Sequence, residues 1–346
     1  MQATATQALI PKVRGMYAKR IRPAEYEEML RRRTVPEVAA LLKRHPYFGD
    51  SLATLSTTDP HRGQIEELLE MDIFLKYERL MQYDFSGEAF SRYYLAECEM
   101  RQVLKALHLL SIGIPGAYLG QIPGYLAGKT RVDLFELGRA KNFAEVVQAT
   151  RHTPYYKALK AREAADPLLC DFPMAEATLL HEGYARLFAL AARSLRGREA
   201  RAVRDLFLQQ AEVYNLELLL RVKTYFPTVY APAKIHALML PYTFRLNRRR
   251  LEEMVQAKSP EAVLALLRAA GLSHYAGPAD PDALGAEEGR ATWQYARRML
   301  HLAAAPMAAL AAFLSLAGLI RDNVVNVIEG VRYGLPPEQI RGMLRQ

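Results

Sequence analysis

The chain has 346 residues, of which 51% are apolar and 24% charged. These values are ordinary for a globular protein, and the length allows two or three domains with cores of their own. The formal net charge is +9; it favours an acidic partner such as nucleic acid, an anionic membrane surface or an acidic protein face, without choosing among them. Cys98 and Cys170 have no partner spacing, so we expect buried free thiols in a reducing compartment, and we expect no secretory signal at the start.

Helical patterns run through the chain in order. A basic amphipathic helix is expected beyond Pro11, and a break at Pro23 separates it from a second helix. Apolar residues at helical spacing predict further long helices over 59–83, 85–111, 175–195 and 199–225. The first of these begins at an Asp-Pro helix start, a loop is expected over 277–289, and a short helix closes the chain.

The sequence predicts an all-α protein, because sustained period-two alternation with hairpin turns is missing from it. One stretch, 300–320, carries no formal charge and has about the twenty residues that a membrane span needs. Its alanine-rich composition and Pro306 favour a buried core helix over a membrane span. Its counterparts in the rest of the chain, 90–98 and 206–213, carry charge, which also favours the core helix.

A first motif recurs along the chain. Glu37 stands nine residues before a Pro-Tyr pair that contains Tyr47, and Glu145 stands nine residues before the pair that contains Tyr155. A looser third copy contains Tyr275. Repetition at a long, regular period is typical of a duplicated supersecondary unit. These tyrosines, together with Tyr156, are expected to pack in the core, the alternative being an exposed rim that meets a partner.

A second motif recurs at the same period on the predicted long helices. Met100, Asn215 and Asn323 align at separations of 115 and 108 residues. The block around Asn215 begins at Glu212, and the block around Asn323 ends at Gly330. We therefore predict three homologous sequence repeats, 1–125, 126–240 and 241–346, separated by segments rich in glycine and proline.

Catalytic and ligand-binding motifs are weak. The segment GYLAGKT over 124–130 resembles a phosphate-binding loop, but three residues instead of four separate its glycines and no buried strand precedes it. We expect a turn between repeats there. The histidines lack metal-ligand spacing, and no nucleophile elbow occurs. We accordingly predict no catalytic residue, metal, cofactor or small-molecule substrate.

Arg245, Arg248, Arg249 and Arg250 form the densest basic cluster in the sequence. Two interpretations remain open for this cluster. The cluster either keeps the protein soluble, or it docks onto an acidic surface of a partner.

Five segments carry a resemblance to a known family. They are VRGMYAKRI (13–21), VPEVAALLKRHPYF (35–48), FAEVVQATRHTPYY (143–156), EVYNLELLLRVKTYF (212–226) and DNVVNVIEGVRYGLPPEQIRGML (322–344). With them the chain resembles the C subunit of archaeal and bacterial V/A-type rotary ATPases, the homologue of the eukaryotic subunit d. Met100 and Ile320 depart from the residues that this family tends to have, which bears on individual polar contacts more than on the fold.

The resemblance implies a non-catalytic rotor subunit of an ATPase or ATP synthase, monomeric in isolation. Three helical repeats would form a funnel around a pseudo-threefold axis. The subunit would receive the central shaft, sit on the membrane proteolipid ring at the inner, cytoplasmic face of the cell membrane, and transmit torque for proton or sodium transport. Arg245 and its neighbours would then dock onto ring loops and anionic headgroups. The alternative is a free-standing helical-repeat scaffold or a basic nucleic-acid-binding protein, although no nucleic-acid motif supports it.

Overall fold

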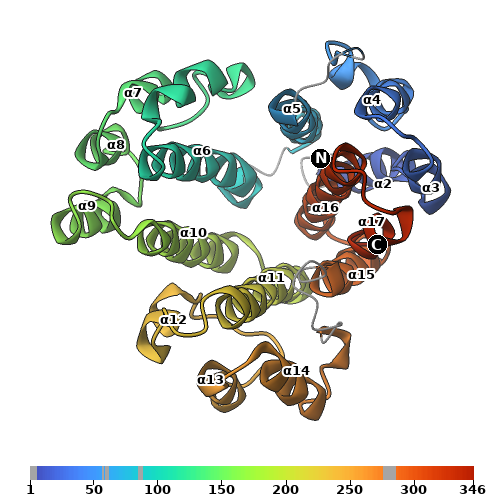
Figure 1. The fold of residues 1–346 in the computed structure, drawn as a ribbon. Helices are drawn as coiled ribbons and strands as arrows, with labels where there is room; N and C mark the ends of the chain where they lie inside the picture. The colour runs from blue at the N-terminus through green and yellow to red at the C-terminus, as the bar shows by residue number, and fades with distance from the viewer. Residues whose placement is uncertain (1–5, 57, 59–61, 85–88, 276–285) are drawn as a thin grey trace. The chain divides into compact units, whose positions relative to one another are not determined.

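The computed structural model describes residues 6–56, 58, 62–84, 89–275 and 286–346 (Figure 1). These residues form α-helices and short 3-10 helices, and no strand occurs among them. The all-α prediction is confirmed. The start of the expected helix at Asp59 and most of the expected loop over 277–289 lie outside the described residues.

The α-helices are α2 (Leu9–Ala18), α3 (Pro23–Leu30), α4 (Val35–Arg44), α5 (Arg62–Met81), α6 (Tyr93–Ser111), α7 (Leu134–Arg139), α8 (Phe143–Ala149), α9 (Tyr156–Ala165), α10 (Phe172–Ser194), α11 (Gly197–Tyr225), α12 (Pro232–Leu238), α13 (Arg248–Gln256), α14 (Pro260–Ala269), α15 (Ala286–Leu302), α16 (Pro306–Arg332) and α17 (Pro337–Gly342). The 3-10 helices are η1 (Gly49–Leu52), η2 (Ala89–Arg92), η3 (Pro115–Gln121), η4 (Gly124–Leu126) and η5 (Ser273–Tyr275).

The first recurring motif is a helix start. The backbone N–H of Glu37 donates to Thr34 Oγ1 at 3.4 Å at the start of α4, and that of Glu145 donates to Asn142 Oδ1 at 3.0 Å at the start of α8. Each glutamate in turn accepts from the backbone N–H that precedes the capping residue, at 3.0 and 2.8 Å. Ser259 caps α14 through the N–H three residues on. These bonds satisfy backbone donors that a helix start otherwise leaves unpaired, so the motif repeats because the local geometry repeats.

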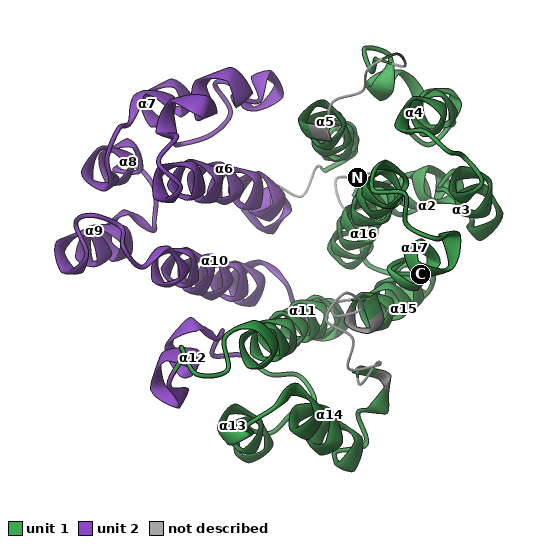
Figure 2. Ribbon diagram, viewed as in Figure 1, with its two compact units in different colours: residues 1–87, 197–230, 243–346 green, residues 88–196, 231–242 purple. Residues whose placement is uncertain are grey.

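The helices cluster into two compact units (Figure 2). Unit 1 comprises residues 1–87, 197–230 and 243–346, and unit 2 comprises residues 88–196 and 231–242. Within unit 1, α16 packs against α2, α5, α11 and α15; within unit 2, α6 packs against α7, α8 and α10. The predicted division into three sequence repeats is a separate matter and stays a prediction.

The uncharged stretch over 300–320 is two helices rather than one. Helix α15 ends at Leu302 and α16 begins at Pro306, because proline suits the first helical position, where its missing N–H costs nothing. Among the described residues, α16 alone is long and apolar enough to cross a membrane. However, 72% of its most apolar window is buried inside the protein. This burial supports the core-helix interpretation.

Two sequence expectations need correction. The helix expected over 85–111 begins only at Tyr93 among the described residues, after η2. Cys98 is buried as expected, but Cys170 is exposed; both are free thiols. Cys170 lies in the loop before α10, where the Asp166 carboxylate accepts its backbone N–H at 3.0 Å and Leu169 has a φ of 54°. The local turn therefore keeps this residue out of any helical face that could be buried.

Candidate functional site

Glu212, in α11, holds the segment that leads into the basic cluster. Its side chain is 1% exposed. One carboxylate oxygen, Oε2, accepts the backbone N–H groups of Phe244, Arg245 and Leu246 at 2.7, 2.8 and 2.8 Å. Hydrogen bonds to an ionised acceptor are about twice as strong as neutral ones, so this buried carboxylate fixes the chain directly before α13.

Glu99, in α6, likewise accepts backbone N–H groups in unit 2. Its Oε2 accepts the backbone N–H of Arg131 and, at 3.2 Å, that of Val132, directly before α7. Its Oε1 accepts the hydroxyl of Tyr155 at 3.1 Å. Burial and then the Glu99 charge raise the pKa of the Tyr155 hydroxyl, which therefore stays a neutral donor.

The sequence analysis missed Glu99. The alignment through Met100 matched Glu97 with Glu212, but Glu97 pairs with Arg101 at 2.5 Å, one turn along the same helix. Glu99 is 4% exposed and follows Cys98, which is also buried. Its position on the apolar face of α6 could have identified it from the sequence. A carboxylate buried on such a face needs buried hydrogen-bond donors.

The markers of the third repeat also hold backbone or allow close packing. Asn323 is fully buried, and its Oδ1 accepts the backbone N–H of Arg345 at 2.7 Å. A Cβ added to Gly330 would lie 2.5 Å from Ile340 Cγ1, so the missing side chain lets α17 approach α16. Asn215 on α11, the residue of the second repeat that aligns with Asn323, is likewise buried, with 1% of its surface exposed.

The three recurring tyrosines are core residues. Tyr47 is 4% exposed, Tyr155 5% and Tyr275 1%. Their burial excludes these three rings from an exposed rim, whereas Tyr156, the first residue of α9, is half-buried. Beneath Tyr47, the ammonium group of Lys76 lies 3.4 Å from the ring centre and pairs with Asp72, so this marker also covers a buried ion pair.

The basic cluster lies at the start of α13, and all four of its arginines are exposed. Asn247 caps α13 by accepting the N–H of Arg250 at 2.9 Å, which places Arg248, Arg249 and Arg250 in the first turn. That turn has no acidic residue, whereas the first turns of α4, α8 and α14 each contain a glutamate.

Cations in a first turn face the positive end of the helix dipole, which disfavours them by about 0.3–1 kcal/mol each. Local partners offset part of this cost for two of the three. Arg249 Nε lies 3.0 Å from Glu253 Oε1, and Arg250 Nη1 donates to the carbonyl oxygen of Ala270 at 3.1 Å. The Arg249 side chain nevertheless remains 89% exposed. The cluster is a solvent-facing group of positive charges on a backbone segment that Glu212 and Asn247 hold.

The structure also bears on the candidate phosphate-binding loop and on metal binding. The segment over 124–130 forms η4 and a turn in which Gly128 has a φ of 70°. Within the described parts of the chain, no group of three or more His, Cys, Asp or Glu side chains is placed to hold a metal ion.

The chain was also compared with known proteins. A family model described as ATP synthase (C/AC39) subunit matches residues 9–343. The comparison with curated proteins gives no match.

Proposed function

Since this chain belongs to the ATP synthase (C/AC39) subunit family, the C or d subunits of V/A-type rotary ATPases, we propose that it is a non-catalytic rotor subunit. It receives the central shaft, sits on the membrane proteolipid ring and transmits torque between them. The chain is a subunit of a membrane-associated ATPase complex; the proposal adds the place at the inner, cytoplasmic face of the cell membrane. The observation that carries it is the family match, which extends from α2 to α17.

A threefold arrangement of the sequence repeats is part of this proposal. Each repeat contains two consecutive short helices, namely α3 and α4 (after α2), α7 and α8, and α13 and α14. The capping bonds at α4, α8 and α14 correspond, and so do the buried carboxylates Glu99 and Glu212. A funnel built from three such repeats would present similar surfaces in three directions, which suits a part that joins a many-fold ring to a single shaft.

The arginine cluster is proposed as a docking surface for the ring. Arg245, Arg248, Arg249 and Arg250 are exposed, and the segment before them is fixed by Glu212. Exposed positive charges suit polar loops of the ring and anionic lipid headgroups, and they raise the rate of association at low salt.

Binding to the central shaft tests the proposed function. We expect the purified chain, monomeric alone, to form a one-to-one complex with the central-shaft subunits of the same organism, measured by pull-down and native mass spectrometry. A chain that is helical by circular dichroism yet binds no shaft would contradict the proposal. That result would favour a helical scaffold or a nucleic-acid-binding protein. Salt-dependent binding of random duplex DNA would support the nucleic-acid-binding alternative.

A further inference from the structure

Exposed large apolar residues concentrate at the C-terminal ends of three long helices, α6, α11 and α16. The described parts of the chain expose ten large apolar residues, and six of them lie at these ends with exposed fractions from 42% to 71%. Single exposed apolar residues scattered over a surface need no explanation, but a concentration of them marks a site of interaction. These six residues, the apolar helix ends, are Ile112 and Ile114 after α6, Tyr225, Phe226 and Val229 at the end of α11, and Tyr333 after α16.

The apolar helix ends follow the period of the sequence repeats. Ile114 and Val229 are 115 residues apart, and Tyr225 and Tyr333 are 108 residues apart. These are the two separations of the second recurring motif, which lies on the same three helices. The exposed apolar residues therefore belong to the repeated helix end rather than to one local sequence.

Within unit 1, two of the helix ends point the same way. Near the starts of α11 and α16, the backbone N–H of Met307 donates to Glu199 Oε1 at 2.8 Å. Farther along both helices, Gln210 Nε2 donates to Ser315 Oγ at 2.8 Å. Since start lies beside start and middle beside middle, α11 and α16 run parallel. Their exposed tyrosines therefore lie at the same end of unit 1.

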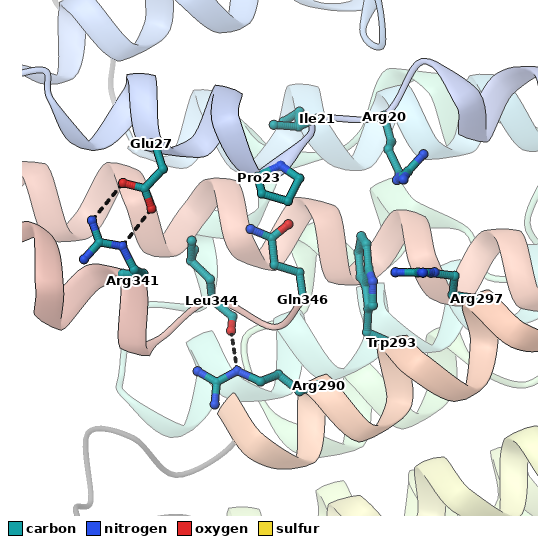
Figure 3. Close-up of a pocket in the computed structure, with 10 residues that line it drawn as sticks. All are labelled: Arg20, Ile21, Pro23, Glu27, Arg290, Trp293, Arg297, Arg341, Leu344 and Gln346. Atoms are coloured by element: carbon teal, nitrogen blue, oxygen red, sulfur yellow. Dashed lines mark hydrogen bonds and ion pairs between the residues drawn. The ribbon is translucent and has the colours of Figure 1, made fainter.

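Both of these ends are held by local contacts. After α11, the rings of Phe226 and Tyr230 pack edge to face with centres 5.8 Å apart, and the N–H of Val229 donates to the carbonyl oxygen of Phe226 at 3.1 Å. After α16, helix α17 is fastened to α3, because Arg341 donates to the two carboxylate oxygens of Glu27 at 2.7 and 2.8 Å (Figure 3). Side chains on such ordered turns lose little freedom on binding, which favours binding.

The charge around the apolar helix ends has one sign. Residues 100–132 and 218–251, which include the ends of α6 and α11, contain no Asp or Glu but four and seven Lys or Arg residues, respectively. At the end of α16, Arg332 is the only charged residue over 330–337. A surface that is both apolar and basic complements a partner that is both apolar and anionic.

We propose that the apolar helix ends bind the surface of an anionic lipid bilayer, with their side chains at the boundary between headgroups and acyl chains. The inference rests on the proposed place of the chain at the membrane. Tyrosine suits that boundary because its ring is apolar and its hydroxyl polar, while nearby cations attract anionic headgroups.

The small size of each helix end favours a bilayer over a protein partner. A stable protein interface buries about 800 Å² on each side, from roughly 20–30 residues. Each helix end exposes one to three large apolar residues, which can enter a bilayer surface without a matching pocket. The arginines at the start of α13 are a separate surface, because the carbonyl oxygen that Lys223 of α11 contacts, at 2.7 Å, belongs to Val255 near the other end of α13.

Cosedimentation of the full chain with protein-free vesicles tests the proposal. The vesicles contain equal parts of phosphatidylcholine and phosphatidylglycerol, and vesicles of phosphatidylcholine alone are the comparison. We expect saturable binding to the anionic vesicles and weaker binding to the neutral ones. High salt should reduce the binding without abolishing it, because salt screens the charges but leaves the burial of apolar side chains in place.

A triple variant, Tyr225→Ser/Val229→Ser/Tyr333→Ser, removes exposed apolar side chains from the ends of α11 and α16. It should weaken binding to the anionic vesicles by about tenfold or more, because the apolar area available for burial is lost while the net charge stays the same. All three residues are more than half exposed, so the variant should remain folded, and circular dichroism measures this.

The matched control, Phe135→Ser/Leu168→Ser/Leu302→Ser, also removes three large apolar side chains. These residues are 58%, 85% and 75% exposed, and none lies at the C-terminal end of α6, α11 or α16. Leu302 precedes the start of α16 and so lies at the opposite end of that helix from the proposed contact. The control should bind the anionic vesicles as the unaltered chain does.

Loss of vesicle binding in the triple variant, with the control unaffected, supports the proposal. Absence of saturable binding by the unaltered chain overturns it, and so does an equal loss in the control, because the effect would then be one of general hydrophobicity. A triple variant that binds vesicles normally but loses the central shaft would also overturn it, since the helix ends would then contact a protein. Failure of the proposed function is distinguishable, because it shows as lost shaft binding by the unaltered chain, measured without lipid.

Discussion

At the scale of single residues, buried polar groups fasten segments that are distant in sequence. Glu212 is the clearest case, because one oxygen of its carboxylate accepts three backbone N–H groups. We expect Glu212→Gln to lower the free energy of unfolding by about 1–3 kcal/mol, measured by urea denaturation, because the charge behind these bonds is lost. Glu67→Gln, at an exposed position in α5, is the control and should change stability by less than about 0.5 kcal/mol. Equal effects of the two substitutions would contradict the anchoring role of Glu212.

Gly330 and Gly318 form a matched pair in α16. An alanine Cβ at Gly330 would lie 2.5 Å from the buried Ile340 side chain, whereas one at Gly318 would meet nothing within 4 Å. Gly330→Ala should cost about 1–3 kcal/mol through overpacking, and Gly318→Ala should stabilise by about 0.5–1 kcal/mol through helix propensity. Thermal unfolding measures both, and shifts of the same sign would contradict the close contact between α16 and α17.

The buried pair beneath Tyr47 predicts a pH dependence. Burial lowers the pKa of Lys76 to about 8, although the charge of Asp72 opposes this shift, and burial raises the pKa of Asp72. An unfolded lysine keeps a pKa near 10.5, so the unfolded state binds more protons between about pH 8 and 10.5. The free energy of unfolding should therefore rise with pH across this window, by at most about 3 kcal/mol from this group.

The double variant Asp72→Asn/Lys76→Met tests this dependence, because it removes both charges and leaves no unpaired ion in the core. Chemical denaturation of both proteins at several pH values from 8 to 10.5 gives the difference in slope. If the slopes of wild type and variant agree, Lys76 does not titrate in the folded state as we infer.

At the scale of elements, the first turn of α13 differs from those of α4, α8 and α14 in charge. Reversing Arg248, Arg249 and Arg250 to glutamate should weaken association with membranes that carry the proteolipid ring, most strongly at low salt. Stability should stay within about 1 kcal/mol, because acidic residues suit a helix start while the exposed pair with Glu253 is lost. Loss of binding would then reflect docking rather than unfolding.

The matched control reverses three exposed arginines near the start of α11, Arg198, Arg201 and Arg204. This variant has the same net charge as the α13 variant. Cosedimentation with ring-bearing membranes at low and high salt is the measurement. Unchanged binding of the α13 variant under both conditions, or an equal loss in the control, would remove the docking role and leave solubility as the function of the cluster.

At the scale of the whole molecule, the proposed attachment to the membrane is peripheral. Helix α16 meets the length and composition of a membrane span, yet its side chains are largely inside unit 1. We expect an alkaline carbonate wash to release the chain from membranes, with immunoblotting of pellet and supernatant as the measurement. A chain that only detergent extracts would show that α16 enters the bilayer and would contradict the core assignment.

The sequence by itself determined the all-α class, most helix positions and the recurring helix starts. These features are local: the capping bonds of Glu37 and Glu145 join residues three or four positions apart, so a short motif contains the whole interaction. The same locality explains why the five quoted segments sufficed to indicate the family.

Only the tertiary structure decided which polar side chains are buried together. It selected Glu99 rather than Glu97 as the counterpart of Glu212, and it left Cys170 exposed in a loop. It also brought Arg20, Arg290, Arg297 and Arg341, which are distant in sequence, around one cavity (Figure 3). Such groupings depend on packing between segments that are distant in sequence. The local periodicity of a helix shows which residues share a face, but not which distant backbone that face contacts.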